Sequence, residues 1–268
     1  MFENIRPIRE LGQNFLTSPE IAQKIIKEIE PAINDVIIEI GPGRGILTEN
    51  FQLDNLKNLI SIEIDQRLFS NLKKKLGDIS NFKIYNMDFL EFSFSELNLG
   101  KRVKVIGNIP YNITSPIIFK LLENFQFISK VVLMVQKEVA NRIAAKPETK
   151  DYGILSVMTA LHGKVEIAFI VNRYNFKPVP RVDSAVIKID LYNKISGLAD
   201  YNLFCTIVKV CFNTRRKMLH NSLQKIISKD NILRLRSNML TERPENLSVD
   251  EFKKLANEIY FQRSIEKI

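Results

Sequence analysis

The sequence is poor in residues that bind metals or form disulfides. It holds two cysteines and two histidines in 268 residues. The spacing of Cys205 and Cys211 fits neither a zinc knuckle nor a redox pair, so buried, reduced thiols are expected, as in a cytosol. His162 and His220 lie far apart along the chain and offer no metal cluster. The sequence therefore predicts no metal site.

Long hydrophobic runs are also missing. The longest strongly apolar runs, such as Val131–Val135, have the length of a β-strand and are far too short to span a membrane. Residues 1–10 mix charged and apolar side chains without an apolar core, so no signal peptide is expected. We therefore expect a cytoplasmic protein with no membrane partner.

Acidic residues are outnumbered by basic ones. The chain has 39 Lys+Arg and 30 Asp+Glu, for a net charge of +9. This balance favours a polyanionic partner, nucleic acid before an anionic membrane surface, although a generally basic proteome is the alternative. Residues 201–268 hold 13 Lys+Arg and 7 Asp+Glu, which is +6 of the +9. The basic face is therefore expected in the last quarter of the chain.

Short β-branched runs alternate with amphipathic stretches over the first 190 residues. Strands are expected over 36–40, 59–64, 82–85, 103–106 and 131–135, with helices over 68–76 and 116–125. This alternation predicts an α/β, Rossmann-like fold with a parallel sheet and helices on both faces. The runs 165–171 and 185–191 are expected to close the sheet, with antiparallel pairing.

The pattern changes after residue 191. Before that point, the prolines of Phe176–Arg181 remove ladder donors, so this segment is expected to be an extended surface loop. Residues 193–200 resemble a linker, and from Tyr201 onward the apolar spacing is helical. The sequence thus predicts a large domain over residues 1–194 and a small, basic α-helical domain over 195–268.

A glycine-rich turn follows the first expected strand. Residues 36–40 run into Gly41-Pro42-Gly43-Arg44-Gly45 and then into a helical pattern, which is the context of a nucleotide site. Gly41 and Gly43 allow the backbone close to a ligand, although a plain tight turn is the alternative. Glu63 ends the next strand about 20 residues on, where an acidic residue accepts both ribose hydroxyls. A charged residue at a strand end is the alternative there.

Asp88 and Phe89 follow the third strand. The Asp88 carboxylate can accept a hydrogen bond from an adenine amino group, and Phe89 can contact the adenine ring. The alternative is that Asp88 is an ordinary turn residue. The glycine turn has Arg44 but no Lys-Ser/Thr pair, and Glu39, Glu63 and Asp88 surround it. Carboxylates disfavour phosphates and favour a cation. S-adenosylmethionine, a sulfonium without phosphate, therefore fits better than NAD.

The fourth strand ends in Asn108-Ile109-Pro110-Tyr111. An adenine N6 is a poor nucleophile because its lone pair is delocalised into the ring. The side-chain oxygen of Asn108 and the carbonyl of Ile109 are expected to accept its hydrogens and aim the lone pair, on a turn that Pro110 stiffens. Tyr111 is expected to stack on an extruded base. Orientation and preorganised dipoles then replace a strong general base, with a simple β-turn as the alternative.

Phe176 in the proline-rich loop is a candidate for the opposite face of the same base. A hydrophobic anchor for that loop is an equal alternative. Sequence pattern alone does not separate the two.

Eight segments together resemble those of a known family. They are Leu11–Leu16, Glu39–Gly45, Ile62–Asp65, Met87–Phe89, Gly107–Pro116, Gln136–Ala140, Phe176–Ser184 and Phe212–Lys217. The chain resembles the ribosomal RNA adenine dimethyltransferases over nearly its whole length, and most closely the bacterial small-subunit branch. The resemblance implies a Rossmann-like methyltransferase fold and S-adenosylmethionine as donor. It also implies dimethylation, at N6, of two adjacent adenosines in a loop near the 3′ end of 16S rRNA.

The same resemblance implies further partners and roles. It places Asn14 and Leu16 near the methionine part of the donor, and it agrees with the roles given above to Gly41, Glu63, Asp88 and Asn108. The implied substrate is 16S rRNA within a pre-30S subunit, and we expect the protein to act as a monomer in ribosome biogenesis.

Arg215, Arg216 and Lys217 are expected to grip rRNA phosphates, with a solvated helix face as the alternative. Other functions stay open. A 23S rRNA methyltransferase of the macrolide-resistance type shares the donor site and the Asn-x-Pro-Tyr string, but Pro116 and the Arg215–Lys217 segment favour the 16S branch. A non-catalytic assembly factor on the same scaffold is a third function. The basic tail disfavours a fourth, a small-molecule methyltransferase.

Overall fold

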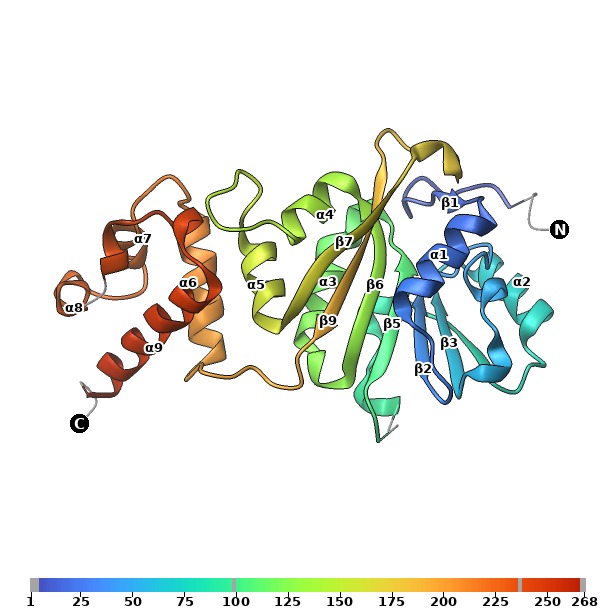
Figure 1. Cartoon of the computed structure of the whole chain (residues 1–268), viewed down its shortest axis with the longest axis horizontal. Coiled ribbons are helices and arrows are strands. Elements are labelled where there is room, and N and C mark those ends of the chain that lie inside the picture. The colour runs from blue at the N-terminus through green and yellow to red at the C-terminus, as the bar shows by residue number, and fades with distance from the viewer. Residues whose placement is uncertain (1–4, 98–99, 236–237, 266–268) are drawn as a thin grey trace. The chain divides into compact units, whose positions relative to one another are not determined.

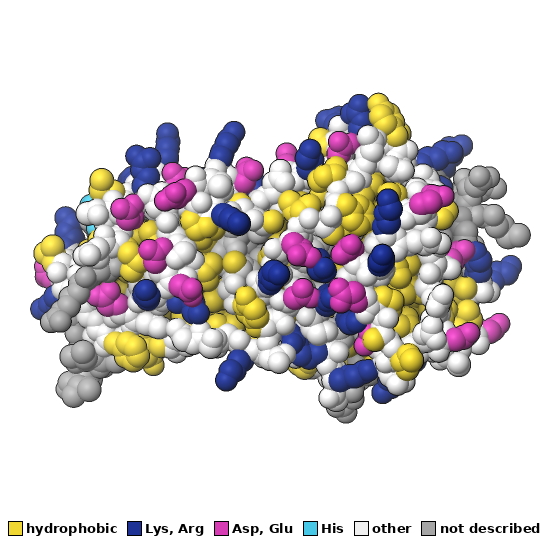
Figure 2. All heavy atoms as spheres, in the orientation of Figure 1, with side chains coloured by type: hydrophobic (Ala, Val, Ile, Leu, Met, Phe, Trp, Pro, Cys, Tyr) yellow, Lys and Arg dark blue, Asp and Glu magenta, His cyan; other side chains and the backbone are white. Residues whose placement is uncertain are grey.

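The structure, a computed structural model, describes residues 5–97, 100–235 and 238–265. It divides the chain into two compact units (Figure 1). The first comprises residues 1–140 and 163–193, and the second comprises residues 141–162 and 194–268. On the face shown in Figure 2, basic and acidic side chains are interspersed over both units.

A seven-stranded sheet forms the centre of the first unit. Its strands are β2 (Val36–Ile40), β3 (Asn58–Glu63), β4 (Phe82–Asn86), β5 (Val103–Asn108), β6 (Ile128–Gln136), β7 (Gly163–Val171) and β9 (Ser184–Leu191). They lie in the order β4-β3-β2-β5-β6-β9-β7. The first five are parallel, and β9 is antiparallel to both β6 and β7. The predicted α/β class and the antiparallel closing strands are confirmed.

The order of these strands positions a ligand site. From β2 the chain first builds outward through β3 and β4, and then returns to place β5 on the other side of β2. This reversal is the topological switch point, where open α/β sheets bind ligands beyond the carboxyl ends of their strands. The site is therefore expected after β2 and β5.

Helices cover the sheet of the first unit. They are α1 (Pro19–Ile29), α2 (Gln66–Leu76), α3 (Thr114–Glu123) and α4 (Lys137–Ile143), the last of which contains the boundary with the second unit. The N-terminus of α1 is capped by Ser18, whose hydroxyl accepts a hydrogen bond from the Ile21 N–H.

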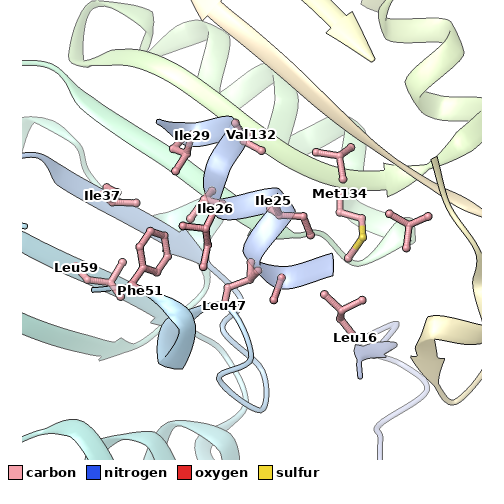
Figure 3. Close-up of a cluster of buried hydrophobic side chains, with 14 of the residues drawn as sticks. Leu16, Ile25, Ile26, Ile29, Ile37, Leu47, Phe51, Leu59, Val132 and Met134 are labelled. Carbon is pink, nitrogen blue, oxygen red and sulfur yellow. The ribbon is translucent and has the colours of Figure 1, made fainter. Parts of the chain in front are cut away.

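One stripe of α1 faces the sheet. Its Ile25, Ile26 and Ile29 lie among strand side chains such as Ile37 and Val132 in a buried cluster (Figure 3). Each fully buried aliphatic side chain of this size contributes about 1.5–3 kcal/mol. The strand residues that point to the opposite face are equally buried, namely Ile38, Val105, Val131 and Leu133. The sheet is therefore covered on both faces, as its near-continuous apolar strands predicted.

Part of the predicted surface loop over Phe176–Arg181 is a strand instead. Phe176 and Lys177 form β8 (Phe176–Lys177), which pairs antiparallel with β1 (Phe15–Leu16), so that Leu16 lies opposite Phe176. The prolines begin only at Pro178, and both residues of β8 therefore keep their N–H groups. Val179, Arg181 and Val182 are exposed, as a surface loop requires.

The second unit is helical. Its elements include α5 (Ile154–His162), α6 (Tyr201–Phe212), α7 (Leu219–Leu223), α8 (Lys229–Arg234) and α9 (Val249–Ile265). It differs from the predicted 195–268 domain because residues 141–162 also belong to it. Tyr152 explains this: its ring packs against Phe212 with centroids 5.9 Å apart, and its hydroxyl donates to the Leu247 carbonyl at 2.8 Å. No helix among the described residues is long and apolar enough to cross a membrane.

The ends of β2 and β5 pack closely at Gly107, and a substitution there measures how closely. A Cβ there would lie 2.7 Å from the carbonyl oxygen of Ile40 on β2 and 3.0 Å from the Ile109 side chain. Because that oxygen belongs to a paired strand, Gly107→Ala is expected to lower the free energy of unfolding by about 1–3 kcal/mol in urea titrations. Gly153→Ala is the matched control, since its Cβ would meet no described atom within 4 Å. Equal effects of the two substitutions would contradict this packing.

Candidate functional site

A cavity of about 240 Å³ opens beyond the carboxyl ends of β2, β3, β4 and β5. Its wall includes residues 10–16, 39–44, 62–64, 87–89 and 108–113. It thus brings together predicted site residues from five separate parts of the sequence. They are Asn14, Leu16, Gly41, Gly43, Glu63, Asp88, Phe89, Asn108, Ile109, Pro110 and Tyr111.

The glycine turn leaves open space in front of Gly41, whereas a Cβ at Gly43 would lie 3.2 Å from the Phe15 ring. Gly41 and Gly43 have φ values of +61° and +59°, which glycine adopts without strain. A Cβ at Gly41 would meet no described atom within 4 Å, so the cavity extends up to the backbone there. The N–H of Gly43 donates to Oε2 of Glu63 at 3.0 Å. The turn and the end of β3 are therefore joined into one wall.

Glu63 is almost fully buried, at 4% exposure. Its Oε1 accepts a hydrogen bond from the N–H of Asp65 at 2.9 Å, in addition to the bond from Gly43. Burial raises the pKa of Glu63, while these backbone donors oppose the rise. A carboxylate has about four lone-pair sites, so two backbone bonds leave capacity for two ligand hydroxyls. This arrangement fits a ribose.

Glu39 is the second buried carboxyl group in the wall, at 1% exposure. Its Oε2 accepts hydrogen bonds from the hydroxyls of Thr48 at 2.7 Å and Ser61 at 2.9 Å. Its Oε1 has no hydrogen-bond partner among the described residues. Burial raises the pKa of Glu39 to about 7. A cationic or hydrogen-donating ligand in the cavity would relieve this desolvation.

Asp88 and Phe89 occupy the wall beyond β4. Asp88 Oδ1 accepts from the N–H of Leu90 at 2.8 Å and so caps a short 3-10 turn (Phe89–Glu91). The Phe89 ring is held by two aromatic neighbours, Phe92 and Phe94, whose centroids lie 6.2 and 6.0 Å away. Both predicted residues therefore have a fixed orientation.

Asn108 is oriented by a backbone group far away in the sequence. Its Nδ2 donates to the carbonyl of Asn14 at 2.9 Å. Because a carbonyl can only accept, the NH₂ of Asn108 must face Asn14, and Oδ1 is left for another donor. The following residue is anchored as well, since the N–H of Ile109 donates to the carbonyl of Met134 on β6 at 3.0 Å. Two oxygens, on Asn108 and Ile109, thus belong to a rigid turn.

Tyr111 lies half-buried at the start of a 3-10 turn (Tyr111–Ile113). Its hydroxyl is 2.7 Å from Oγ of Ser184, which is fully buried at the start of β9. Burial raises the pKa of the Tyr111 hydroxyl, which keeps the ring neutral. Sequence reasoning gave Ser184 no separate role, because its partner is 73 residues away.

The segment from residue 5 to residue 16 is tied to the cavity by polar contacts. Gln13 accepts a hydrogen bond from the N–H of Ile8 at 2.8 Å and donates to Asp65 Oδ2 at 2.9 Å. The Arg44 guanidinium lies 4.5 Å from the centroid of the Phe15 ring. These contacts were missed from the sequence. The one feature of the sequence that could have indicated these contacts is the polar pair Gln13-Asn14 immediately before two apolar residues.

Phe176 does not line the cavity. It is 2% exposed, lies opposite Leu16 in the β1–β8 pair, and belongs to the main hydrophobic cluster. This placement favours the anchor over the base-contact alternative, because contact with a base requires the ring to leave the cluster.

The three basic residues after α6 lie in the second unit and differ from one another. Arg215 Nε is 2.6 Å from Glu245 Oε2, and its guanidinium donates to the carbonyls of Thr149 and Lys150. Arg216 and Lys217 are exposed. Arg215 therefore stabilises its own unit, and the other two are the cations that face solvent.

Comparison with known proteins identifies the family. The sequence model of the family Ribosomal RNA adenine dimethylase matches residues 6–260. The chain belongs to this family. Ribosomal RNA small subunit methyltransferase A of Chlorobium phaeobacteroides is 41% identical over 94% of this chain and 90% of its own length. The protein of the same name from Francisella tularensis subsp. novicida is 39% identical over 93% of this chain and 96% of its own length.

Solved structures agree with this assignment. A dimethyladenosine transferase from Plasmodium falciparum superposes with a TM-score of 0.80 and 29% identity, covering 93% of this chain and 98% of its own. The 23S rRNA methyltransferase ErmE superposes with a TM-score of 0.66 and 27% identity, covering 92% of this chain and 100% of its own. The predicted Rossmann-like methyltransferase fold and the family resemblance are confirmed.

The buried Glu39 carboxyl group predicts a pH dependence of stability. Its pKa in the folded protein, about 7, lies above its usual value of 4.5. The folded state therefore keeps the proton to higher pH than the unfolded chain, and stability falls as pH rises between these values. Between pH 4.5 and pH 8, the free energy of unfolding of Glu39→Gln is expected to rise by up to about 3 kcal/mol relative to that of the wild type. Urea unfolding of the unliganded proteins measures this, and parallel pH profiles of the two would contradict it.

Proposed function

We propose that this chain transfers methyl groups from S-adenosylmethionine to N6 of two adjacent adenosines in a loop near the 3′ end of 16S rRNA, giving N6,N6-dimethyladenosine. The observation that carries the proposal is that the Asn108–Tyr111 turn lines the same cavity as Gly41, Glu63 and Asp88. Membership of the rRNA adenine dimethylase family supports it. The relatives at 38–41% identity, which are named as small-subunit enzymes, favour 16S rRNA.

The cavity suits S-adenosylmethionine, which when bound supplies an activated methyl group on a sulfonium. Glu63 would hold the ribose hydroxyls, and Asp88 and Phe89 would hold the adenine. Gly41 and Gly43 would let the backbone approach the donor closely, and Asn14 and Leu16 would contact its methionine part. The carboxyl groups of Glu39, Glu63 and Asp88 in the wall disfavour a pyrophosphate and favour a positively charged ligand.

The chain's own residues orient the target nitrogen. Oδ1 of Asn108 and the carbonyl of Ile109 accept the two hydrogens of the amino group, which biases its lone pair out of the ring plane. The Asn14 carbonyl keeps the Asn108 amide from rotating. Tyr111, held by Ser184, stacks on the base and offsets part of the few kcal/mol needed to extrude it. Catalysis then rests on orientation and fixed dipoles rather than on a strong base.

The finer context is part of the same proposal. The substrate is 16S rRNA within a pre-30S subunit, and the protein acts as a cytoplasmic monomer in rRNA processing. A 23S rRNA enzyme is the second candidate, since ErmE shares the fold at 27% identity, against 41% for a small-subunit relative. A non-catalytic assembly factor is disfavoured because Asn108 and Tyr111 both line the cavity.

The deciding experiment is mass spectrometry of adenosines from ribosomal subunits. Undermethylated small subunits are incubated with the protein and S-adenosylmethionine, with large subunits in parallel. Two adjacent adenosines of the small subunit are expected to gain two methyl groups each. Methylation of large-subunit RNA alone would support the 23S alternative, and methylation of neither would contradict the proposal.

Asn108→Ala separates chemistry from binding. Loss of one preorganised acceptor is expected to lower the rate constant of methylation about 10²- to 10³-fold. Binding to small subunits, measured by co-sedimentation, is expected to persist, because Asn108 lies inside the cavity. If subunit binding disappears together with activity, Asn108 supports the fold instead.

Arg216 and Lys217 are expected to contact rRNA phosphates. Replacing both with Ala should reduce the slope of log affinity against log salt by about 0.7 per lost phosphate contact, because fewer counterions are released. Arg215→Ala is expected to lower thermal stability instead, since it breaks the ion pair with Glu245. A salt slope unchanged in the double variant would remove Arg216 and Lys217 from the interface.

A further inference from the structure

The connection between β7 and β9 carries an aromatic–arginine pair that the proposed chemistry does not use. Tyr174 is 70% exposed. The Arg173 guanidinium lies 5.2 Å from the centroid of its ring, and Nη2 of Arg173 donates to the Tyr174 hydroxyl at 3.2 Å. The two side chains thus form one unit on the surface.

The backbone beneath this pair is held in place. Residues Arg173–Asn175 form a 3-10 turn capped by Asn172, whose side chain accepts from the Tyr174 N–H at 3.0 Å. Arg173 makes two further hydrogen bonds: its backbone N–H donates to Asp183 Oδ1 at 3.0 Å, and its guanidinium donates to the Arg181 carbonyl at 3.1 Å. The ring is therefore presented by a preorganised turn, which lowers the entropy lost when it binds a partner.

Contacts on both sides connect this turn to the cavity wall. On one side, the Asn175 carbonyl accepts from the N–H of Thr17 at 2.8 Å, directly after β1, which lines the cavity. On the other side, Asp183 precedes Ser184, whose hydroxyl holds Tyr111. The golden segment beside β1 in Figure 1 is this connection. The turn that carries the pair is therefore joined on both sides to segments that reach the cavity wall.

The chemistry of the surrounding surface points to one class of partner. Lys177 and Arg181 are exposed on the same loop, together with the apolar Val179 and Val182. Figure 2 shows basic and hydrophobic side chains at the top of the view, where this loop lies, with acidic side chains just below them. Cations beside an exposed aromatic ring match single-stranded nucleic acid, whose phosphates take the charge and whose bases stack.

We propose that Tyr174 and Arg173 form a stacking platform for a nucleotide that flanks the target adenosine, while Lys177 and Arg181 contact its phosphates. This inference rests on the proposed function, because it takes the substrate to be RNA. It gives the first unit an RNA contact beyond the target base, distinct from the exposed cations of the second unit.

The test compares Tyr174→Ala with a matched control, Tyr192→Ala. Tyr192 is 49% exposed and follows β9 at the end opposite Ser184. The probes are a fluorescently labelled single-stranded RNA with two adjacent adenosines, and undermethylated small subunits. Tyr174→Ala is expected to raise the Kd for the RNA and the KM for subunits about tenfold, with kcat unchanged. Tyr174→Phe and Tyr192→Ala are expected to stay within about twofold of the wild type.

The outcomes separate this inference from the proposed function. If the wild type methylates small subunits but Tyr174→Ala leaves Kd and KM unchanged, the platform is overturned and the function stands. Loss of thermal stability or of S-adenosylhomocysteine affinity in Tyr174→Ala would also overturn it, because the ring would then support the fold. If the wild type does not methylate subunits, the proposed function fails, and the Kd for the labelled RNA alone still decides whether the platform exists.

Discussion

The pairing of β2 with β5 determines where the rest of the first unit can act. In this register Ile40 lies opposite Gly107, so the two strands end side by side. The glycine turn that follows Ile40 and the Asn108 turn that follows Gly107 therefore leave the sheet at the same edge. Because Gly107 has no side chain, the Ile40 carbonyl can lie close to it. The two turns thus become neighbours through strand register.

Two buried carboxyl groups, Glu39 and Glu63, lie at this edge of the sheet. Glu63 is satisfied by backbone N–H groups, whereas one oxygen of Glu39 keeps no partner among the described residues. Desolvating a carboxylate is unfavourable unless it gains a donor or an opposite charge. The unpartnered oxygen of Glu39 is accordingly a place where a hydrogen-bond donor or a positive charge would be stabilising.

Much of the sheet and of the cavity was predictable from local sequence. Runs such as 36–40 and 131–135 are rich in β-branched residues, and the segments after them carry distinctive short motifs. Helix α1 was not predicted, although Ser18 and Pro19 and the apolar spacing after them signal it. What local pattern could not show depends on distant contacts: the burial of Phe176 against Leu16, the ion pair that occupies Arg215, and the inclusion of Tyr152 in the second unit. The assignment of RNA binding to residues 195–268 and the roles of individual site residues stay predictions.

The hydrogen bond between Asn108 and the Asn14 carbonyl has a consequence for what controls the orientation of Asn108. The segment that contains Asn14 is itself part of the cavity wall. A displacement that separates Asn14 from Asn108 would break this bond and leave the Asn108 amide free to rotate. The orientation of Asn108 therefore depends on a segment 94 residues away in the sequence, and a substitution that moves that segment would also change where Oδ1 of Asn108 points.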